Sequence, residues 1–174
     1  MMNDIINELF DFSQKYTISD LTEINGVKFP ADAALFFKDS INGWNDYIWF
    51  ITPYDKKWNE IIQEQRESYL FLKNDFDQDS IVLGDAPKDG EGYPFDFFPD
   101  ENGLIPWAVC DNGTAFFWKP DNCRITIVIY GDSYEYYEYS MTTTKFLYKL
   151  LNNEIKEIYK FLPRDIFENG IVCC

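Results

Sequence analysis

The sequence predicts a single α+β domain over residues 1–174, in which an antiparallel β-meander sheet of about 4–6 strands is flanked by N-terminal and C-terminal helices. Apart from YIWFI at 47–51, hydrophobic residues recur mainly at helical intervals up to residue 74. They form extended runs separated by short polar turns from 104 to 140, and return to helical spacing from 142. The 174 residues, of which 46% are hydrophobic and 19% aromatic, suit one domain with a sizeable core.

The N-terminal segment is predicted to be helical. A first helix begins after a candidate cap at Asn3 or Asp4. Its hydrophobic stripe consists of Ile5, Ile6, Leu9, Phe10 and Phe12. In SDLTEINGVKFP, Ser19 or Asp20 can cap a short second helix that Gly26 ends in the left-handed conformation.

The next segment, PADAALFFKDSING, is also predicted to be a helix. Pro30 suits its first position, because the fixed φ of proline is already helical and its missing N–H has no partner there anyway. Asn42-Gly43 is expected to end this helix. The side chains expected to point inward are Ala34, Leu35 and Phe37.

The middle of the chain alternates between the two periods. YIWFI predicts a strand at 47–51, KKWNEIIQEQRESYLFLKN predicts a long amphipathic helix at 56–74, and SIVLG predicts a short strand at 80–84. Residues 85–103 are rich in Gly, Pro and Asp and predict a long loop, which in compact domains is often functional.

Four extended runs then predict the meander: LIPWAVC, AFFWK, RITIVIY and YEYYEYS. Asn112-Gly113 between the first two predicts a two-residue hairpin loop, which would pair Cys110 with Ala115 and Trp107 with Trp118. One sheet face would carry Trp107, Val109, Phe116 and Trp118, and the other Ala108, Cys110, Ala115 and Phe117. We expect these aromatic residues to form core rather than a pocket, with helices covering one side.

The C-terminal part returns to helical spacing. TTTKFLYKLL predicts a helix at 142–151, and EIKEIYKFL continues the pattern at 154–162 until Pro163. The buried stripe of the first of these helices is expected to be Phe146, Leu147, Leu150 and Leu151.

The net charge of −15 narrows the classes of partner. Such a surface repels phosphate backbones and anionic lipid headgroups, so we expect no nucleic acid and no membrane as a partner. A cationic macromolecule would be attracted and oriented by the same field. The alternative is that the acidity serves solubility alone. The N-terminus resembles no secretory signal, so we expect a cytoplasmic protein.

The chain contains no histidine, which excludes Ser-His-Asp and Cys-His catalysis and histidine-ligated metals. The four cysteines form no CxxC pair and are expected to be reduced thiols. DFDQDSIVLGDA begins like a calcium loop, but Ser80 and Ala86 stand where Gly and a bidentate Glu are needed. We therefore predict no metal, no cofactor and no catalytic residue.

Three segments, in order, resemble the SUKH superfamily (Smi/Knr-like proteins). They are INGVKFPADAALFFKDSING, FDFFPDENGLIPWAVCDNGTAFFW and ITIVIYGDSYEYYEYSMTTTKFLYKLL, which together extend from about Ser19 to Leu151. The chain departs from the family pattern at Trp44 and at Ala108-Val109, where glycines are common. The superfamily includes bacterial immunity proteins that bind and neutralise toxins, often nucleases, and fungal cell-wall assembly regulators.

The resemblance implies a non-catalytic immunity protein whose partner is a cognate toxin with a basic surface. An acidic, aromatic surface can occupy a nuclease site, because carboxylates stand in for phosphates and aromatic rings serve as anchors. The candidate partner-binding residues lie near loops and turns: Asp96, Asp100, Glu101, Asp111, Asp132, Tyr134, Glu135, Tyr136 and Glu138.

Two alternatives stay open. A regulatory adaptor of the cell-wall-regulator type would bind peptides or proteins through the loop at 85–103. A carbohydrate-active enzyme would use carboxylates such as Asp96, Asp100 and Glu101 beside aromatic residues, since paired carboxylates hydrolyse glycosides without histidine.

Overall fold

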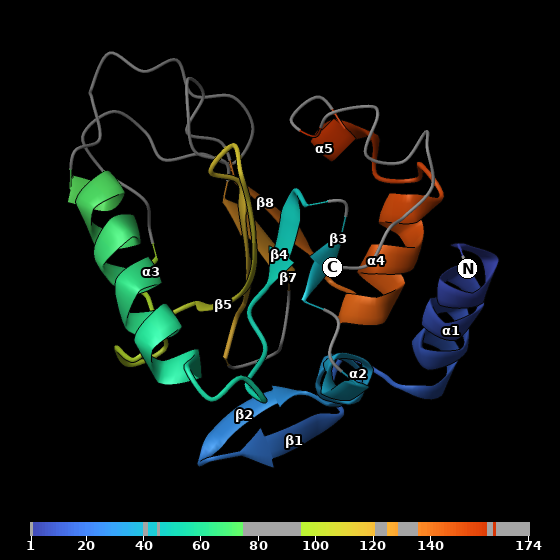
Figure 1. The fold of residues 1–174 in the computed structure, drawn as a ribbon, viewed down its shortest axis with the longest axis horizontal. Coiled ribbons are helices and arrows are strands. Elements are labelled where there is room, and N and C mark those ends of the chain that lie inside the picture. Colours follow the sequence, from blue (N-terminus) through green and yellow to red (C-terminus); the bar gives the residue numbers. More distant parts are fainter. Residues whose placement is uncertain are drawn as a thin grey trace.

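Figure 1 shows the computed structural model of the protein, which describes residues 2–39, 42–44, 46–74, 95–120, 125–128, 136–159 and 162. The main sheet is antiparallel, and its six strands follow one another in chain order: β3 (Gly43–Trp44), β4 (Ile48–Phe50), β5 (Ile105–Cys110), β6 (Ala115–Trp118), β7 (Ile125–Val128) and β8 (Tyr136–Tyr139). This confirms the predicted α+β fold with a meander sheet.

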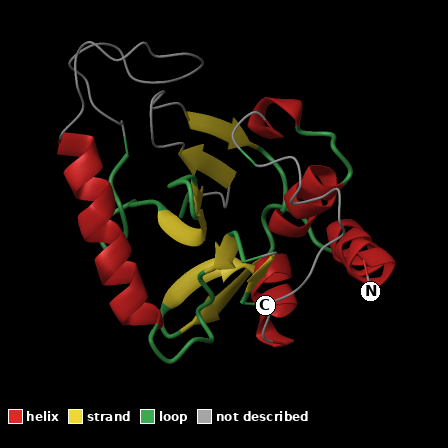
Figure 2. Ribbon diagram, turned by 45° about the horizontal axis from the view of Figure 1, so that its top comes forward, coloured by secondary structure: helices red, strands yellow, loops and turns green. Residues whose placement is uncertain are grey.

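The helices lie on both sides of this sheet rather than on one. They are α1 (Met2–Lys15), α2 (Ala31–Phe36), α3 (Trp58–Asn74), α4 (Thr143–Leu151) and α5 (Lys156–Tyr159), with a 3-10 turn at Phe37–Asp39. The two views place α3 on one side of the sheet, and α1, α2 and α4 packed together on the other (Figure 1 and Figure 2). The predicted opening helix, long amphipathic helix and first closing helix are confirmed. The second closing helix, predicted at 154–162, is described as α5 over Lys156–Tyr159 only.

The short helix predicted from Ser19 or Asp20 to Gly26 is wrong. The segment is a β-hairpin of β1 (Leu21–Ile24) and β2 (Val27–Pro30), and it forms a separate two-stranded sheet. Asn25 and Gly26 have φ of 54° and 81°, and two positive φ values are what a type I′ turn requires. Gly26 therefore turns a hairpin instead of ending a helix.

The helix predicted from Pro30 to Asn42-Gly43 is too long. Pro30 is its N-cap, α2 ends at Phe36, and Leu35 is 42% exposed, whereas Phe36 and Phe37 are buried. Gly43 belongs to β3 instead, where it pairs with Trp49. A Cβ on Gly43 would lie 2.3 Å from the carbonyl oxygen of Ile48, so only glycine allows the two strands this approach.

The hairpin of β5 and β6 was predicted with the wrong register. Its loop has three residues, Asp111 to Gly113, closed by bonds from Cys110 N to Thr114 O (2.8 Å) and from Gly113 N to Cys110 O (2.9 Å). Only Gly113 has a positive φ (84°) there, as in a three-residue loop. Val109 therefore pairs with Ala115, and the register shifts at Trp107, between Pro106 and Ala108.

The predicted faces are only partly correct. Trp107, Phe116 and Trp118 share one face as predicted, but Ala108 and Cys110 join them there, and Val109 lies with Ala115 on the other face. Trp107 stacks on Trp118 with ring centroids 5.9 Å apart and contacts Phe146 of α4. On the opposite face, Phe117 packs against Tyr69 of α3 at 4.9 Å. Trp107, Trp118 and Phe117 are at most 1% exposed, so the prediction that the aromatic hairpin forms core is confirmed.

Two buried polar contacts attach α4 to the rest of the core. The indole N–H of Trp118 donates to Thr143 Oγ1 at 2.9 Å. Asp32 of α2 is 1% exposed, and its Oδ2 accepts from the backbone N–H of Thr144 (2.7 Å) and from Thr144 Oγ1 (2.8 Å). Burial raises the pKa of Asp32, and these hydrogen bonds only partly oppose the effect.

Candidate partner-binding surface

Three of the predicted acidic residues lie in one loop before β5. Asp96, Asp100 and Glu101 are all exposed. The loop is closed by hydrogen bonds from Leu104 N to Asp96 O (2.7 Å) and from Gly103 N to Asp100 O (2.9 Å). A Cβ on Gly103 would lie 2.4 Å from the backbone carbon of Phe97, so the loop depends on glycine at this position. The carboxylates therefore project from a well-defined backbone.

Asp100 is joined to the long helix. Nη2 of Arg66 in α3 lies 2.9 Å from Oδ1 and 2.8 Å from Oδ2 of Asp100. The pair is partly exposed, so we expect it to orient the loop more than to stabilise the fold. This arrangement does not favour the carbohydrate-active alternative, because Asp100 is already engaged by a permanent cation.

Asp111 lies at the other end of β5, in the turn before β6. Its Oδ1 accepts a 2.9 Å hydrogen bond from the indole N–H of Trp49. Asp111 follows the last residue of β5, Cys110, whereas the acidic loop precedes its first residue, Ile105, so the strand, at most roughly 17 Å long, separates them. The structure thus places Asp111 apart from Asp96, Asp100 and Glu101, and not in one continuous cluster with them.

The two described candidates on β8 are half-buried. Tyr136 packs edge-on against Phe95 with ring centroids 5.0 Å apart, and Glu138 forms an ion pair with Lys119. Across β7, Tyr136 is in register with Ala115 and Glu138 is in register with Phe117. Both pairs lie on the face of the sheet that α3 covers. The contacts of Tyr136 and Glu138 with Phe95 and Lys119 therefore help to hold the sheet together as well as leaving part of each side chain exposed.

The remaining candidates, Asp132, Tyr134 and Glu135, lie outside the described residues. So do the predicted strand at 80–84 and the first part of the predicted loop, residues 85–94.

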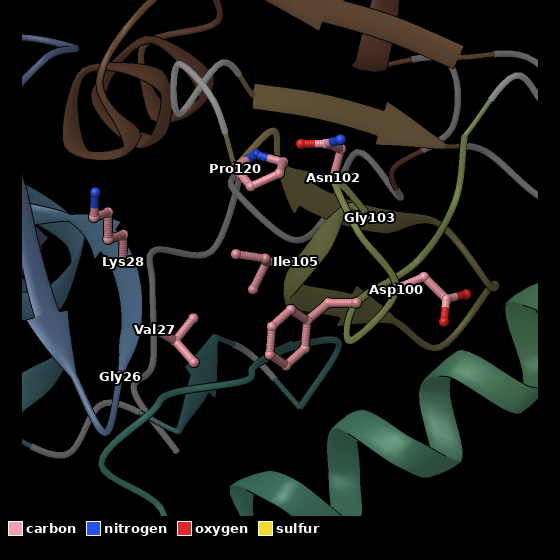
Figure 3. Close-up of a pocket in the computed structure, with 9 residues that line it drawn as sticks. Gly26, Val27, Lys28, Asp100, Asn102, Gly103, Ile105 and Pro120 are labelled. Atoms are coloured by element: carbon pink, nitrogen blue, oxygen red, sulfur yellow. The ribbon is translucent and has the colours of Figure 1, made fainter.

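A hollow of about 250 Å³ adjoins the acidic loop (Figure 3). Val27, Phe98, Ile105 and Pro120 give it an apolar lining, and Lys28 and Asn102 stand on opposite walls. The carboxylate of Asp100 turns away from the hollow towards α3, where Arg66 binds it. The hollow is smaller than typical ligand pockets, and its size suits one inserted side chain.

Burial raises the pKa of two titratable side chains near the start of the β5–β6 turn, Cys110 and Tyr47. Cys110 is buried and burial raises the pKa of its thiol, so this cysteine stays protonated at neutral pH. Burial, followed by the nearby Cys110 and Asp111, raises the pKa of Tyr47 to about 12. Among the described residues, no group of three or more Cys, Asp or Glu side chains is placed to hold a metal ion.

Two residues of this surface, Trp49 and Arg66, were not predicted from the sequence. Trp49 lies between Ile48 and Phe50, which are buried, while 39% of Trp49 itself is exposed. Strand alternation in YIWFI would have predicted that Trp49 faces away from its two neighbours. No sequence signal pointed to Arg66, because its partner lies 34 residues away.

Comparisons of the chain with protein-family models, with curated proteins and with solved structures found no match. The resemblance to the SUKH superfamily therefore stays a prediction from sequence motifs. Within the part of the chain that the structure describes, no helix is long and apolar enough to cross a membrane.

Proposed function

We propose that this chain is a non-catalytic immunity protein that binds and neutralises a cognate cationic toxin domain, such as a nuclease, in the cytoplasm. The observation that carries the proposal is the hydrogen-bonded loop on which Asp96 and Glu101 are exposed, in a chain of net charge −15. Exposed carboxylates can stand in for the phosphates that a nuclease site binds, and the charge favours rapid encounter with a basic surface. The motif resemblance to SUKH proteins supports the same function.

The proposal is tested with the protein encoded beside this chain, where that neighbour is a long polymorphic toxin. We expect a stoichiometric complex in calorimetry, protection of cells that express the toxin, and binding that weakens between about 50 and about 300 mM NaCl. Absence of both complex and protection would refute the immunity function. Binding unaffected by salt would refute its electrostatic part.

A charge-matched pair of variants locates the surface. Asp96→Asn with Glu101→Gln removes two loop charges, while Asp11→Asn with Glu8→Gln removes two exposed charges from α1. Because exposed interface charges act mainly on encounter, we expect the loop variant to associate several-fold more slowly and the α1 variant to change much less. Equal effects would show that only net charge matters.

The regulatory adaptor remains a second candidate, and the hollow beside the loop favours it. Phe98 and Asn102 belong to the segment from which peptide binding was predicted, and the apolar lining suits one side chain of a peptide. Val27→Phe should fill the hollow. If the protein is an adaptor, Val27→Phe should lose partners that the wild type captures from cells. If the hollow instead serves immunity, Val27→Phe should lose protection against the toxin.

A further inference from the structure

Trp49 differs from every other tryptophan of the chain. The chain has five tryptophans, all in described segments. Trp44, Trp58, Trp107 and Trp118 are between 0% and 6% exposed, but Trp49 is 39% exposed. Tryptophan is enriched in binding hot spots, so an exposed tryptophan is a candidate anchor for a partner.

The ring of Trp49 is held in place by a carboxylate. Trp49 pairs with Val109 across β4 and β5, and Asp111 lies two residues beyond Val109 on the same face of the sheet. The indole N–H donates to Asp111 Oδ1 at 2.9 Å, which fixes the plane of the ring. Asp111 Oδ2 accepts no hydrogen bond from the residues that the structure describes, so this oxygen is available to a donor from outside.

The surroundings of the ring are negatively charged. The β3–β4 and β5–β6 turns are adjacent, because Asp111 N donates to Tyr47 O at 3.2 Å. The carboxylate of Asp111 lies at the edge of the ring, and residues 46–50 and 108–114 contain no Lys or Arg. A cation arriving here therefore meets the negative face of an indole, a free carboxylate oxygen and no neighbouring positive charge in these two segments.

We propose that Trp49 and Asp111 form a binding site for an arginine side chain of the partner protein. The guanidinium stacks on the exposed indole face and donates to Asp111 Oδ2. Arginine suits the site better than lysine, because a planar guanidinium can stack and donate in its own plane at the same time. The inference rests on the proposed function for the cationic partner, and it adds a second contact point at the other end of β5 from the acidic loop.

Tyr54 provides an internal comparison. Its ring is 41% exposed, similar to that of Trp49, but it precedes Lys56 and Lys57 in the chain. With Asp55 included, residues 55–57 carry one net positive charge, which opposes the approach of a cation. Exposure alone therefore does not make an arginine site at Tyr54, and Tyr54→Leu serves as a control that removes an equally exposed aromatic ring.

The probe is an eight-residue peptide of alternating Arg and Gly, compared with the same peptide containing neutral citrulline. Indole N–H resonances of the full ¹⁵N-labelled chain are recorded at low salt. The signal absent from Trp49→Leu should shift saturably with the arginine peptide, and less with the citrulline one. Trp49→Leu and Asp111→Asn should each weaken binding about two- to fivefold, and Tyr54→Leu should leave it unchanged. The Asp111→Asn change retains an oxygen for the indole N–H but removes the charge.

Two outcomes would overturn the inference: a Trp49 signal that the arginine peptide does not move, or one that both peptides move equally. Unchanged signals of the four buried tryptophans report that each variant is folded. If the toxin complex forms with equal affinity in Trp49→Leu, the inference fails and the proposed function stands. If the arginine peptide binds at Trp49 but no toxin is bound, the proposed function fails and the site stands.

Discussion

Replacing Asp32 should reveal how far a single buried carboxylate holds α2 to α4. Asp32→Ala leaves the Thr144 N–H and hydroxyl buried without an acceptor, since both bonds reach the same oxygen of Asp32. An unpaired buried polar group costs about 1–3 kcal/mol, so we expect a loss of about 2–4 kcal/mol at neutral pH. Asp32→Asn keeps one oxygen for both donors and should cost less, about 1 kcal/mol.

The same residue predicts a pH dependence of a definite sign. Burial raises the pKa of Asp32 above its ordinary value of 3.8, so the folded state binds its proton more tightly than the unfolded state. The stability that this residue contributes is therefore fully present below about pH 3.8 and is lost as the pH rises through the folded-state pKa. Protonation at Oδ1 leaves Oδ2 free to accept both bonds from Thr144.

Urea unfolding of the wild type and of Asp32→Asn measures this dependence, with fluorescence of the buried tryptophans as the signal. The free-energy difference between the two proteins should be larger near pH 4 than at pH 7, because only the wild type titrates at this position. A difference that is constant, or larger at pH 7, would refute the argument that burial dominates the pKa of Asp32. A double-mutant cycle with Thr144→Val isolates the energy of the contact.

Three further substitutions test separate causes of stability. Gly26→Ala meets no atom within 4 Å but must keep a φ of 81°, so it should cost about 1–2 kcal/mol of unfolding free energy through backbone strain alone. Gly103→Ala places a Cβ 2.4 Å from backbone, so the loop should shift at a cost of at least about 2 kcal/mol and toxin binding should weaken. Trp118→Phe leaves Thr143 Oγ1 buried without its donor and should cost about 1–3 kcal/mol. Urea unfolding gives each free energy.

Each of these values has its own control. Asparagine tolerates a positive φ better than alanine, so Gly26→Asn should lose less stability than Gly26→Ala. Backbone strain predicts this difference, whereas a packing defect does not. Gly103→Ala would contradict the steric argument if stability and toxin association were both unchanged. For Trp118→Phe, the companion Thr143→Val should remove much of the penalty, because it eliminates the unpaired hydroxyl; a larger loss in the double variant would argue against this.

The candidate surface was only partly predictable. Asp96, Asp100 and Glu101 are close in sequence, so their common loop follows from composition alone. Their relation to Arg66 and the separation of Asp111 depend on how α3 and the two ends of β5 lie in space. Trp49 was overlooked because an apolar run of five residues indicates a strand, and only its alternation shows which side chain faces out.

The sequence by itself determined the α+β class, the order of the strands in the meander and the positions of α1, α3 and α4, because hydrophobic period is a local property that the chain carries without its neighbours. The structure decided what Asn-Gly means. Asn25-Gly26 turns a hairpin, Asn42-Gly43 enters a strand, and Asn112-Gly113 belongs to a three-residue loop. Each outcome depends on strands that approach from elsewhere in the chain, and no local pattern encodes that approach.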